Sequence, residues 1–190
     1  MPQSVFANLS LQLERFKIWF NGLSGTKKLV VSGVTLLVGL AMLQTVFKLI
    51  ASVITLIHAV LHTIGGVFGK PEPGTPAMVL ATMQANRFPV FGSMRSYADF
   101  YLGMGLGITI FLTTEAVAFW LLASLARTDS ARLRPILAAF MVGYLAFAVN
   151  SAVYFFSGPV ITEVLIALCL GMAIITAKPV ATQSTHSVVA

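Results

Sequence analysis

The chain has 190 residues, of which 57% are hydrophobic and only 9% charged, and its formal net charge is +6 at pH 7. A soluble domain normally carries about 25% charged residues, so the composition excludes an ordinary water-soluble domain. The basic residues stand mainly at the ends of apolar runs, where they anchor membrane segments, so the positive charge does not indicate a nucleic-acid partner. We expect an all-α fold: a polytopic transmembrane helical bundle with four core spans.

The first 26 residues are expected to form an amphipathic segment that lies on the membrane surface. In "MPQSVFANLSLQLERFKIWF", apolar side chains such as Phe16 and Trp19 are interleaved with charged ones such as Glu14 and Arg15. This pattern fits an interfacial helix better than a membrane span. It also lacks the order of charged and then apolar residues that marks a cleaved signal peptide.

The first span lies within an unusually long apolar run, from residue 29 to residue 69. A single helix over this run would be about 60 Å long, twice the thickness of the hydrocarbon core. No Pro or Gly-rich turn between Ala41 and Ser52 permits a tight hairpin. We therefore predict one over-long first helix, with residues 48–69 crossing the bilayer and 29–47 covered by another subunit or laid on the membrane. A fifth span at 29–47 is the alternative.

The whole bundle is predicted at residues 27–178. After the first span, an outer loop precedes the other three spans. This loop covers residues 70–98 and contains a short helix around residues 77–85. The three remaining spans are predicted at 101–126, 135–156 and 159–177, and a polar tail follows at 179–190. Each span is long enough to cross about 30 Å of hydrocarbon. The turn at Ser157–Pro159 is short, so the last two spans form an antiparallel hairpin.

The distribution of basic residues indicates the orientation in the membrane. With four spans, eight Lys and Arg residues fall on the side that holds both termini and three fall on the other side. Cytoplasmic loops carry the excess of basic residues, so both termini are expected in the cytoplasm, with the protein in a bacterial inner (plasma) membrane. The eight are Arg15, Lys17, Lys27, Lys28, Arg127, Arg132, Arg134 and Lys178; the three are Lys70, Arg87 and Arg95.

A cluster of polar residues is predicted near the outer membrane surface. Counted along the helices, His62, Asn150 and Glu163 from three different spans fall at similar depths, about 6–10 Å below the outer boundary. Ionisable residues inside a bilayer are costly and usually face the bundle interior or a wet cavity. We take this level as the candidate functional site, with residues one turn deeper and at the surface included: His58, His62, Arg95, Asp99, Asn150 and Glu163.

The two histidines stand four residues apart, so they share one face of their helix. Three interpretations are open: hydrogen bonds to neighbouring helices, a proton or polar-ligand site, and a metal site. A metal would need a third ligand, for example Asp99 or Glu163. The first interpretation is favoured, and no metal site is assigned. Haem is not expected, because bis-histidine ligation needs histidines on opposite sides of the ring and the third histidine, His186, lies in the polar tail.

A second pair of charged residues is predicted deeper in the membrane. Counted from the outer boundary, Glu115 on the second span lies about 22 Å deep and Lys48 on the first lies about 31 Å deep, and helix tilt would bring them to nearly the same level. A buried carboxylate needs a partner or a proton. We therefore predict a structural ion pair between Lys48 and Glu115.

From about residue 58 to residue 178 the chain resembles an uncharacterised bacterial family of small four-helix integral membrane proteins. The resemblance is carried by "HAVLHTIGG", by the loop ending "FGSMRSYADFYLGMGLG" and by the closing "FAVNSAVYFFSGPVITEVLIALCLGMA". It implies a four-helix membrane fold and brings no established activity. A looser architectural similarity to sterol-isomerase-like and DoxX-like proteins implies acidic and histidine residues set in a bundle cavity, although a shared fold does not imply a shared function.

Two functional classes fit these features. The first is an accessory or structural subunit of a larger membrane complex, because the over-long first helix needs a cover, either other membrane subunits or further copies of the chain. The second is a lipid- or quinone-handling membrane protein, an isomerase or redox component that uses the outer polar cluster. Membrane lipids are expected partners in both, lipid or quinone is the candidate cofactor, and enzymatic activity is left open.

Overall fold

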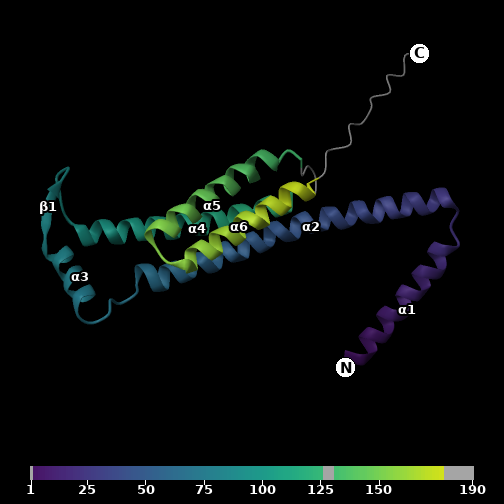
Figure 1. Ribbon diagram of the computed structural model, residues 1–190, viewed down its shortest axis with the longest axis horizontal. Coiled ribbons are helices and arrows are strands. Elements are labelled where there is room, and N and C mark those ends of the chain that lie inside the picture. Colours follow the sequence, from purple (N-terminus) through teal and green to yellow (C-terminus); the bar gives the residue numbers. More distant parts are fainter. Residues whose placement is uncertain (1, 126–130, 178–190) are drawn as a thin grey trace, which may run out of the picture. The chain divides into compact units, whose positions relative to one another are not determined.

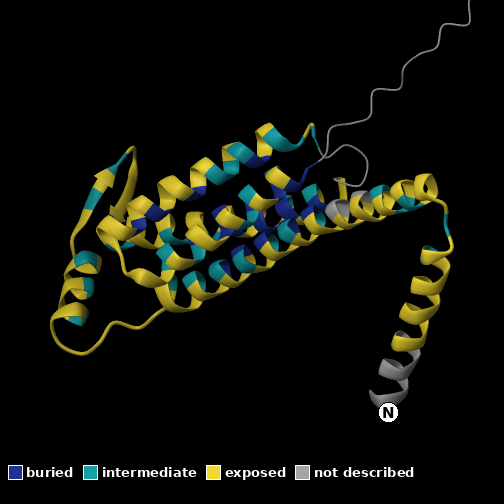
Figure 2. Cartoon of the chain, turned by 45° about the vertical axis from the view of Figure 1, so that its right-hand side comes forward, coloured by how far each residue is buried: buried dark blue, intermediate teal, exposed yellow. Residues whose placement is uncertain are grey.

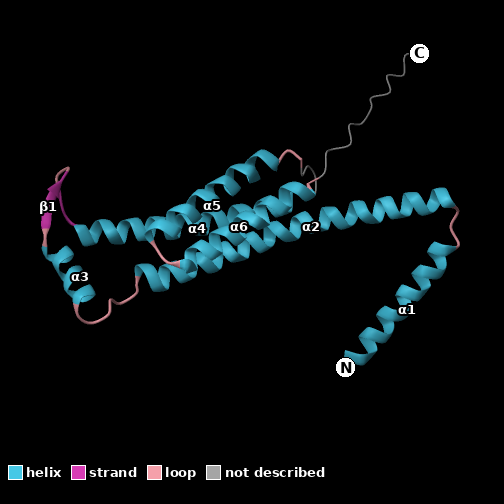
Figure 3. Ribbon diagram, in the orientation of Figure 1, coloured by secondary structure: helices cyan, strands magenta, loops and turns pink. Residues whose placement is uncertain are grey.

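The computed structural model describes residues 2–125 and 131–177, without the side chains of residues 2–9, 37, 40 and 41. The predicted polar tail at 179–190 lies outside these residues. Helices dominate the described chain, and the secondary structure is coloured in Figure 3. The elements in order are α1 (Pro2–Asn21), α2 (Gly25–Leu61), the π-helix η1 (His62–Val67), α3 (Thr75–Ala85), β1 (Arg87–Val90), β2 (Ser93–Ser96), α4 (Tyr97–Leu125), α5 (Arg134–Tyr154) and α6 (Ser157–Thr176).

The chain divides into two compact units, Met1–Met42 and Leu43–Ala190. The first unit contains α1 and the beginning of α2. On α1, Lys17 forms an ion pair with Glu14 at 2.8 Å, and the rings of Phe16 and Phe20 stack with their centroids 6.0 Å apart. Helix α2 runs unbroken from Gly25 to Leu61 and continues into η1. A hairpin that would make residues 29–47 a separate span is therefore absent, and the first helix is over-long as predicted.

The second unit contains a membrane-spanning bundle, which confirms the predicted all-α fold class. Among the described residues, four helices are long and apolar enough to cross a bilayer, and they lie side by side in Figure 1. The spans are Met42–Val67, Tyr97–Leu125, Arg134–Tyr154 and Ser157–Thr176. The protein is thus a multi-pass membrane protein.

Each span buries one narrow face and exposes the rest. On α4 the buried positions include Leu112, Ala116 and Phe119, which recur every three or four residues, the spacing of one helical face. Leu137 on α5 and Leu170 on α6 are fully buried in the same core. In Figure 2 the buried residues lie between the helices and the exposed ones on the outside. Because most exposed side chains are large and apolar, the outer surface suits lipid rather than water.

A small antiparallel hairpin in the outer loop was not predicted. Strand β1 pairs with β2, and Phe91 and Gly92 at the turn have φ angles of 46° and 82°. Two positive φ values fit a type I′ turn, which usually carries Asn-Gly or Asp-Gly. Here the turn reads Phe-Gly, and Pro89 stands in a strand, so the sequence lacks the usual signal. The predicted short helix near residues 77–85 appears as α3.

Candidate functional site

Polar residues line one face of the first span. Their positions fall within an arc of about 80° around the helix, at about 100° per residue, and they extend over about 27 Å of its length. This is close to the thickness of the hydrocarbon core, about 30 Å. All are buried or half-buried in the bundle. We call them the polar stripe: Gln44, Lys48, Thr55, His58 and His62.

At the η1 end of the stripe, His62 bonds to the second span. Its Nε2 lies 3.1 Å from the carbonyl oxygen of Gly105. A carbonyl only accepts, so Nε2 donates, and Nδ1 of the neutral ring remains an acceptor. Two glycines make room for this contact. A Cβ on Gly66 would lie 3.3 Å from His62 Nδ1, and a Cβ on Gly105 would lie 3.1 Å from Val67 Cγ2. Short π-helices such as η1 are rare and frequently occur at functional sites.

One turn along, His58 bonds to the fourth span. Its Nδ1 lies 3.1 Å from Thr162 Oγ1, and that hydroxyl also donates to the carbonyl oxygen of Pro159 at 2.8 Å. Because the hydroxyl has a single proton, His58 Nδ1 donates to it. Both imidazoles therefore hydrogen bond to neighbouring helices. Among the described residues, no three His, Cys, Asp or Glu side chains come together as a metal site would require.

Two buried carboxyl groups lie at the centre of the bundle. Ser151 on α5 donates to Glu163 Oε1 at 3.0 Å, and Tyr144 on α5 donates to Glu115 Oε2 at 2.6 Å. Glu163 is 5% exposed and Glu115 is 7% exposed. The Tyr144 hydroxyl also lies near Thr55 and interacts electrostatically with Glu163. Polar groups from all four spans therefore converge around this one phenol.

The predicted ion pair between Lys48 and Glu115 does not form. Lys48 is fully buried, but its Nζ has no hydrogen-bond partner among the described residues. The register explains this correction. His62 is level with Gly105; Glu115 lies ten residues below Gly105, whereas Lys48 lies fourteen below His62. Lys48 therefore lies about 6 Å deeper than Glu115, at 1.5 Å per residue. The Glu115 carboxyl group accepts a hydrogen bond from Tyr144 instead.

Three members of the predicted cluster lie elsewhere. Asn150 is exposed on α5, next to the buried Ser151. Asp99 accepts from the backbone N–H of Ser96 at 2.7 Å, while Ser96 Oγ accepts from the N–H of Asp99 at 3.1 Å. These reciprocal bonds form a capping box at the start of α4. Arg95 is exposed and donates to the carbonyl of Met94 at 3.4 Å. Arg95 and Asp99 thus shape the hairpin and the start of α4.

A cleft between α4 and α5 opens beside the central carboxyl group. Its volume is about 570 Å³, and Glu115 and Tyr144 supply its ionisable groups. Its apolar wall includes Phe111, which is 50% exposed, and Phe147, which is 43% exposed. The cleft is therefore accessible from the lipid-facing side.

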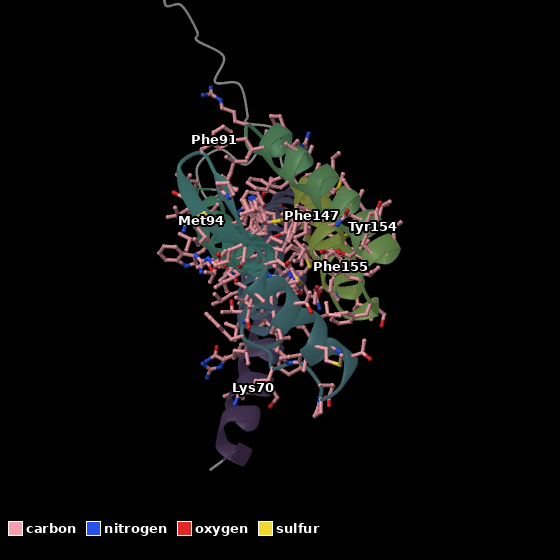
Figure 4. The ribbon with its side chains drawn as sticks, turned by 90° about the vertical axis from the view of Figure 1, so that its left-hand side faces the viewer. Lys70, Phe91, Met94, Phe147, Tyr154 and Phe155 are labelled. Atoms are coloured by element: carbon pink, nitrogen blue, oxygen red, sulfur yellow. The ribbon has the colours of Figure 1, made fainter. Side chains whose placement is uncertain are left out.

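Seen from the hairpin end in Figure 4, Tyr154 and Phe155 at the end of α5 lie on the opposite side from Phe91 and Met94 of the hairpin.

The sequence prediction missed the residues that complete this centre: Thr55, Tyr144, Ser151 and Thr162. A usable signal was present on α5, where Leu137, Tyr144, Ala148 and Ser151 follow a spacing of three, four and seven residues and are all buried. That spacing is typical of a single helical face. A prediction that uses direction as well as depth would select Ser151 over Asn150.

Comparisons with family models, curated proteins and solved structures returned no match to this chain. The resemblance seen in the sequence therefore stays a prediction, and the site has to be interpreted from its own geometry.

Proposed function

We propose that this protein binds a small lipid or quinone in the cleft between α4 and α5. The observation that carries the proposal is an apolar cleft, open on the lipid-facing side, with a hydrogen-bonded carboxyl and phenol at its polar end. Its volume of about 570 Å³ is typical of small-molecule sites, which are mostly apolar with a few convergent polar groups.

The chemistry of the cleft favours an amphipathic ligand with an oxygen-bearing head group. Phe111, Phe140 and Phe147 offer apolar contacts to a hydrocarbon tail. At the polar end, the Tyr144 hydroxyl is a donor and an acceptor, and the Glu115 carboxyl has a second oxygen besides the one that Tyr144 occupies. A ketone, quinone or hydroxyl head group can exchange hydrogen bonds with this pair, which would orient the ligand.

Native mass spectrometry after purification in mild detergent tests this proposal. The wild-type protein should carry a lipid or quinone, and Gly143→Leu should remove it, because Gly143 lines the cleft. A Cβ at Gly143 meets nothing within 4 Å, so the longer side chain can fill the cleft without a clash at Cβ. The matched control is Gly107→Leu, which also has open space at Cβ but does not line the cleft. Equal occupancy in both variants would contradict the proposal.

A second candidate function is that of a subunit in a larger membrane complex. It is favoured by the part of α2 that belongs to the first unit, where Leu29 is 76% exposed and Leu36 is 64% exposed. Such a surface needs lipid or protein around it. The same mass spectrum separates the two functions, because a subunit carries a protein partner, or a further copy of the chain, in a fixed ratio.

We also propose that the protein lies in a bacterial inner membrane with both termini in the cytoplasm, on the strength of the basic residues counted above. In a background with Cys169 replaced by alanine, a single cysteine at Gly74 should react with a membrane-impermeant maleimide in intact cells. A single cysteine at Ala131 should react only after the cells are lysed. Both positions follow a membrane span, so each serves as the control for the other. The reverse pattern of labelling would overturn the orientation.

A further inference from the structure

The polar stripe connects to polar groups on the other three spans at several levels. From the η1 end, the hydrogen bonds are His62 with Gly105, His58 with Thr162, Glu163 with Ser151, and Tyr144 with Glu115, and Thr55 lies near the Tyr144 hydroxyl. Lys48 and Gln44 continue the stripe beyond Glu115, and both are almost fully buried. The result is a column of polar groups inside a bundle whose exterior is apolar.

We propose that this column is a pathway for proton transfer through the bundle, with Glu163 and Glu115 as the groups that carry the proton. A proton that leaves one imidazole or carboxyl group is taken up by the next group along, so each transfer conserves charge and atoms. The Tyr144 hydroxyl donates to Glu115 and interacts electrostatically with Glu163, so it lies between the two carboxyl groups, and a hydroxyl can donate and accept at once. The hydroxyl groups of Thr162 and Ser151 contact His58 and Glu163. Chains of Asp, Glu and His inside membranes are the usual elements of proton relays.

Two buried atoms distinguish a pathway from a set of contacts that only hold helices together. Glu163 Oε2 and Lys48 Nζ have no hydrogen-bond partner among the described residues, although Glu163 is 5% exposed and Lys48 is 0% exposed. An unsatisfied polar group in hydrocarbon costs several kcal/mol, so packing alone would favour an apolar side chain at either position. A group that takes up and releases a proton, or binds a water molecule transiently, needs an atom that is not occupied by a permanent hydrogen bond.

The hydrogen bonds between spans also occupy only some of the donor and acceptor atoms of the ionisable side chains. Thr55 and Thr63 donate to carbonyl oxygens of their own helix, at 2.8 Å and 2.6 Å. Of the ionisable groups, His62 keeps Nδ1 as an acceptor, and Glu115 keeps one carboxyl oxygen besides the one that Tyr144 contacts. These acceptors lie at two levels of the column, at its η1 end and beside Tyr144.

Proton flux into liposomes tests the pathway. The full chain is reconstituted with a pH-sensitive dye inside, and a potassium diffusion potential, negative inside, is applied with valinomycin. We expect proton uptake above that of protein-free liposomes, and Glu163→Gln should reduce the protein-dependent rate at least about tenfold. Glutamine keeps an acceptor oxygen for Ser151 but does not exchange protons, so the variant should fold with an unchanged melting temperature.

The matched control is Glu72→Gln, which neutralises an exposed carboxylate in the outer loop and should leave the rate unchanged. Absence of flux in the wild-type protein, or an undiminished rate in folded Glu163→Gln, would overturn the pathway. The pathway does not depend on the proposed cleft ligand. Glu163 does not line the cleft, so Glu163→Gln should lose the flux and keep the bound lipid, and failure of one proposal is distinguishable from failure of the other.

Discussion

Replacing Lys48 with methionine should raise the free energy of unfolding by about 1–3 kcal/mol, the usual cost of burying a polar group without a partner. Lys48 is 0% exposed, its Nζ has no hydrogen-bond partner among the described residues, and its neighbour one turn away, Ala51, belongs to the apolar core. Methionine has nearly the same length and no polar head. A thermal unfolding experiment in detergent measures the effect as a higher melting temperature.

The control is Lys70→Met, which removes an exposed lysine of the outer loop and should change stability by less than about 0.5 kcal/mol. A double-mutant cycle with Glu115→Gln adds a second measurement. Because Lys48 and Glu115 do not form an ion pair, their effects should add within about 0.5 kcal/mol. If Lys48→Met lost stability and the double variant recovered it, the result would support the ion pair predicted from the sequence.

The same substitution also bears on function. If Lys48 accepts protons in the column, the Lys48→Met variant should show a slower proton flux and a higher melting temperature than the wild-type protein. Opposite changes in stability and activity are common at functional sites, because the native protein keeps a costly group for its chemistry. A residue that served packing alone would show no such opposition.

The spans could be predicted from the sequence because hydrocarbon imposes one strong requirement, a helix of about 20 apolar residues. The level of the polar residues was predicted only in part. Counting residues gives depth, and it set His62 level with Glu163, whereas in the structure His58, one turn deeper, contacts Thr162, the neighbour of Glu163 on α6. Depth gives no direction around the helix, so Asn150 was chosen although it faces outward.

The level of Glu115 was misjudged for a different reason. The counted depths of Glu115 and Lys48 differed by about 9 Å, and this difference was attributed to helix tilt, whereas the contact of His62 with Gly105 leaves Lys48 about 6 Å deeper than Glu115. A shift of four residues moves a side chain by about 6 Å, which is enough to exchange one hydrogen-bond partner for another. The register between spans is set by close packing, such as the Ser52 hydroxyl donating to the Ala116 carbonyl at 2.7 Å, and a single sequence carries little information about it.

Removing the phenolic hydroxyl in Tyr144→Phe should lower the free energy of unfolding by about 1–3 kcal/mol, the usual cost of leaving a buried acceptor unsatisfied. The hydroxyl donates to Glu115 at 2.6 Å, and Tyr144 is 3% exposed. Phenylalanine keeps the ring, which packs on Phe119 with centroids 6.1 Å apart. The loss therefore reports the polar contact rather than a cavity, and thermal unfolding in detergent measures it.

Tyr154→Phe is the matched control, because Tyr154 lies on the same helix and is 75% exposed. Its loss of stability should stay below about 0.5 kcal/mol. Equal stability of both variants would mean that Glu115 does not depend on Tyr144, and the convergence of four spans on this phenol would then have no energetic basis. If the convergence is real, Tyr144→Phe should also weaken ligand retention in the cleft, since the hydroxyl is half of the polar pair that faces it. Stability and retention should then fall together in Tyr144→Phe and remain unchanged in Tyr154→Phe.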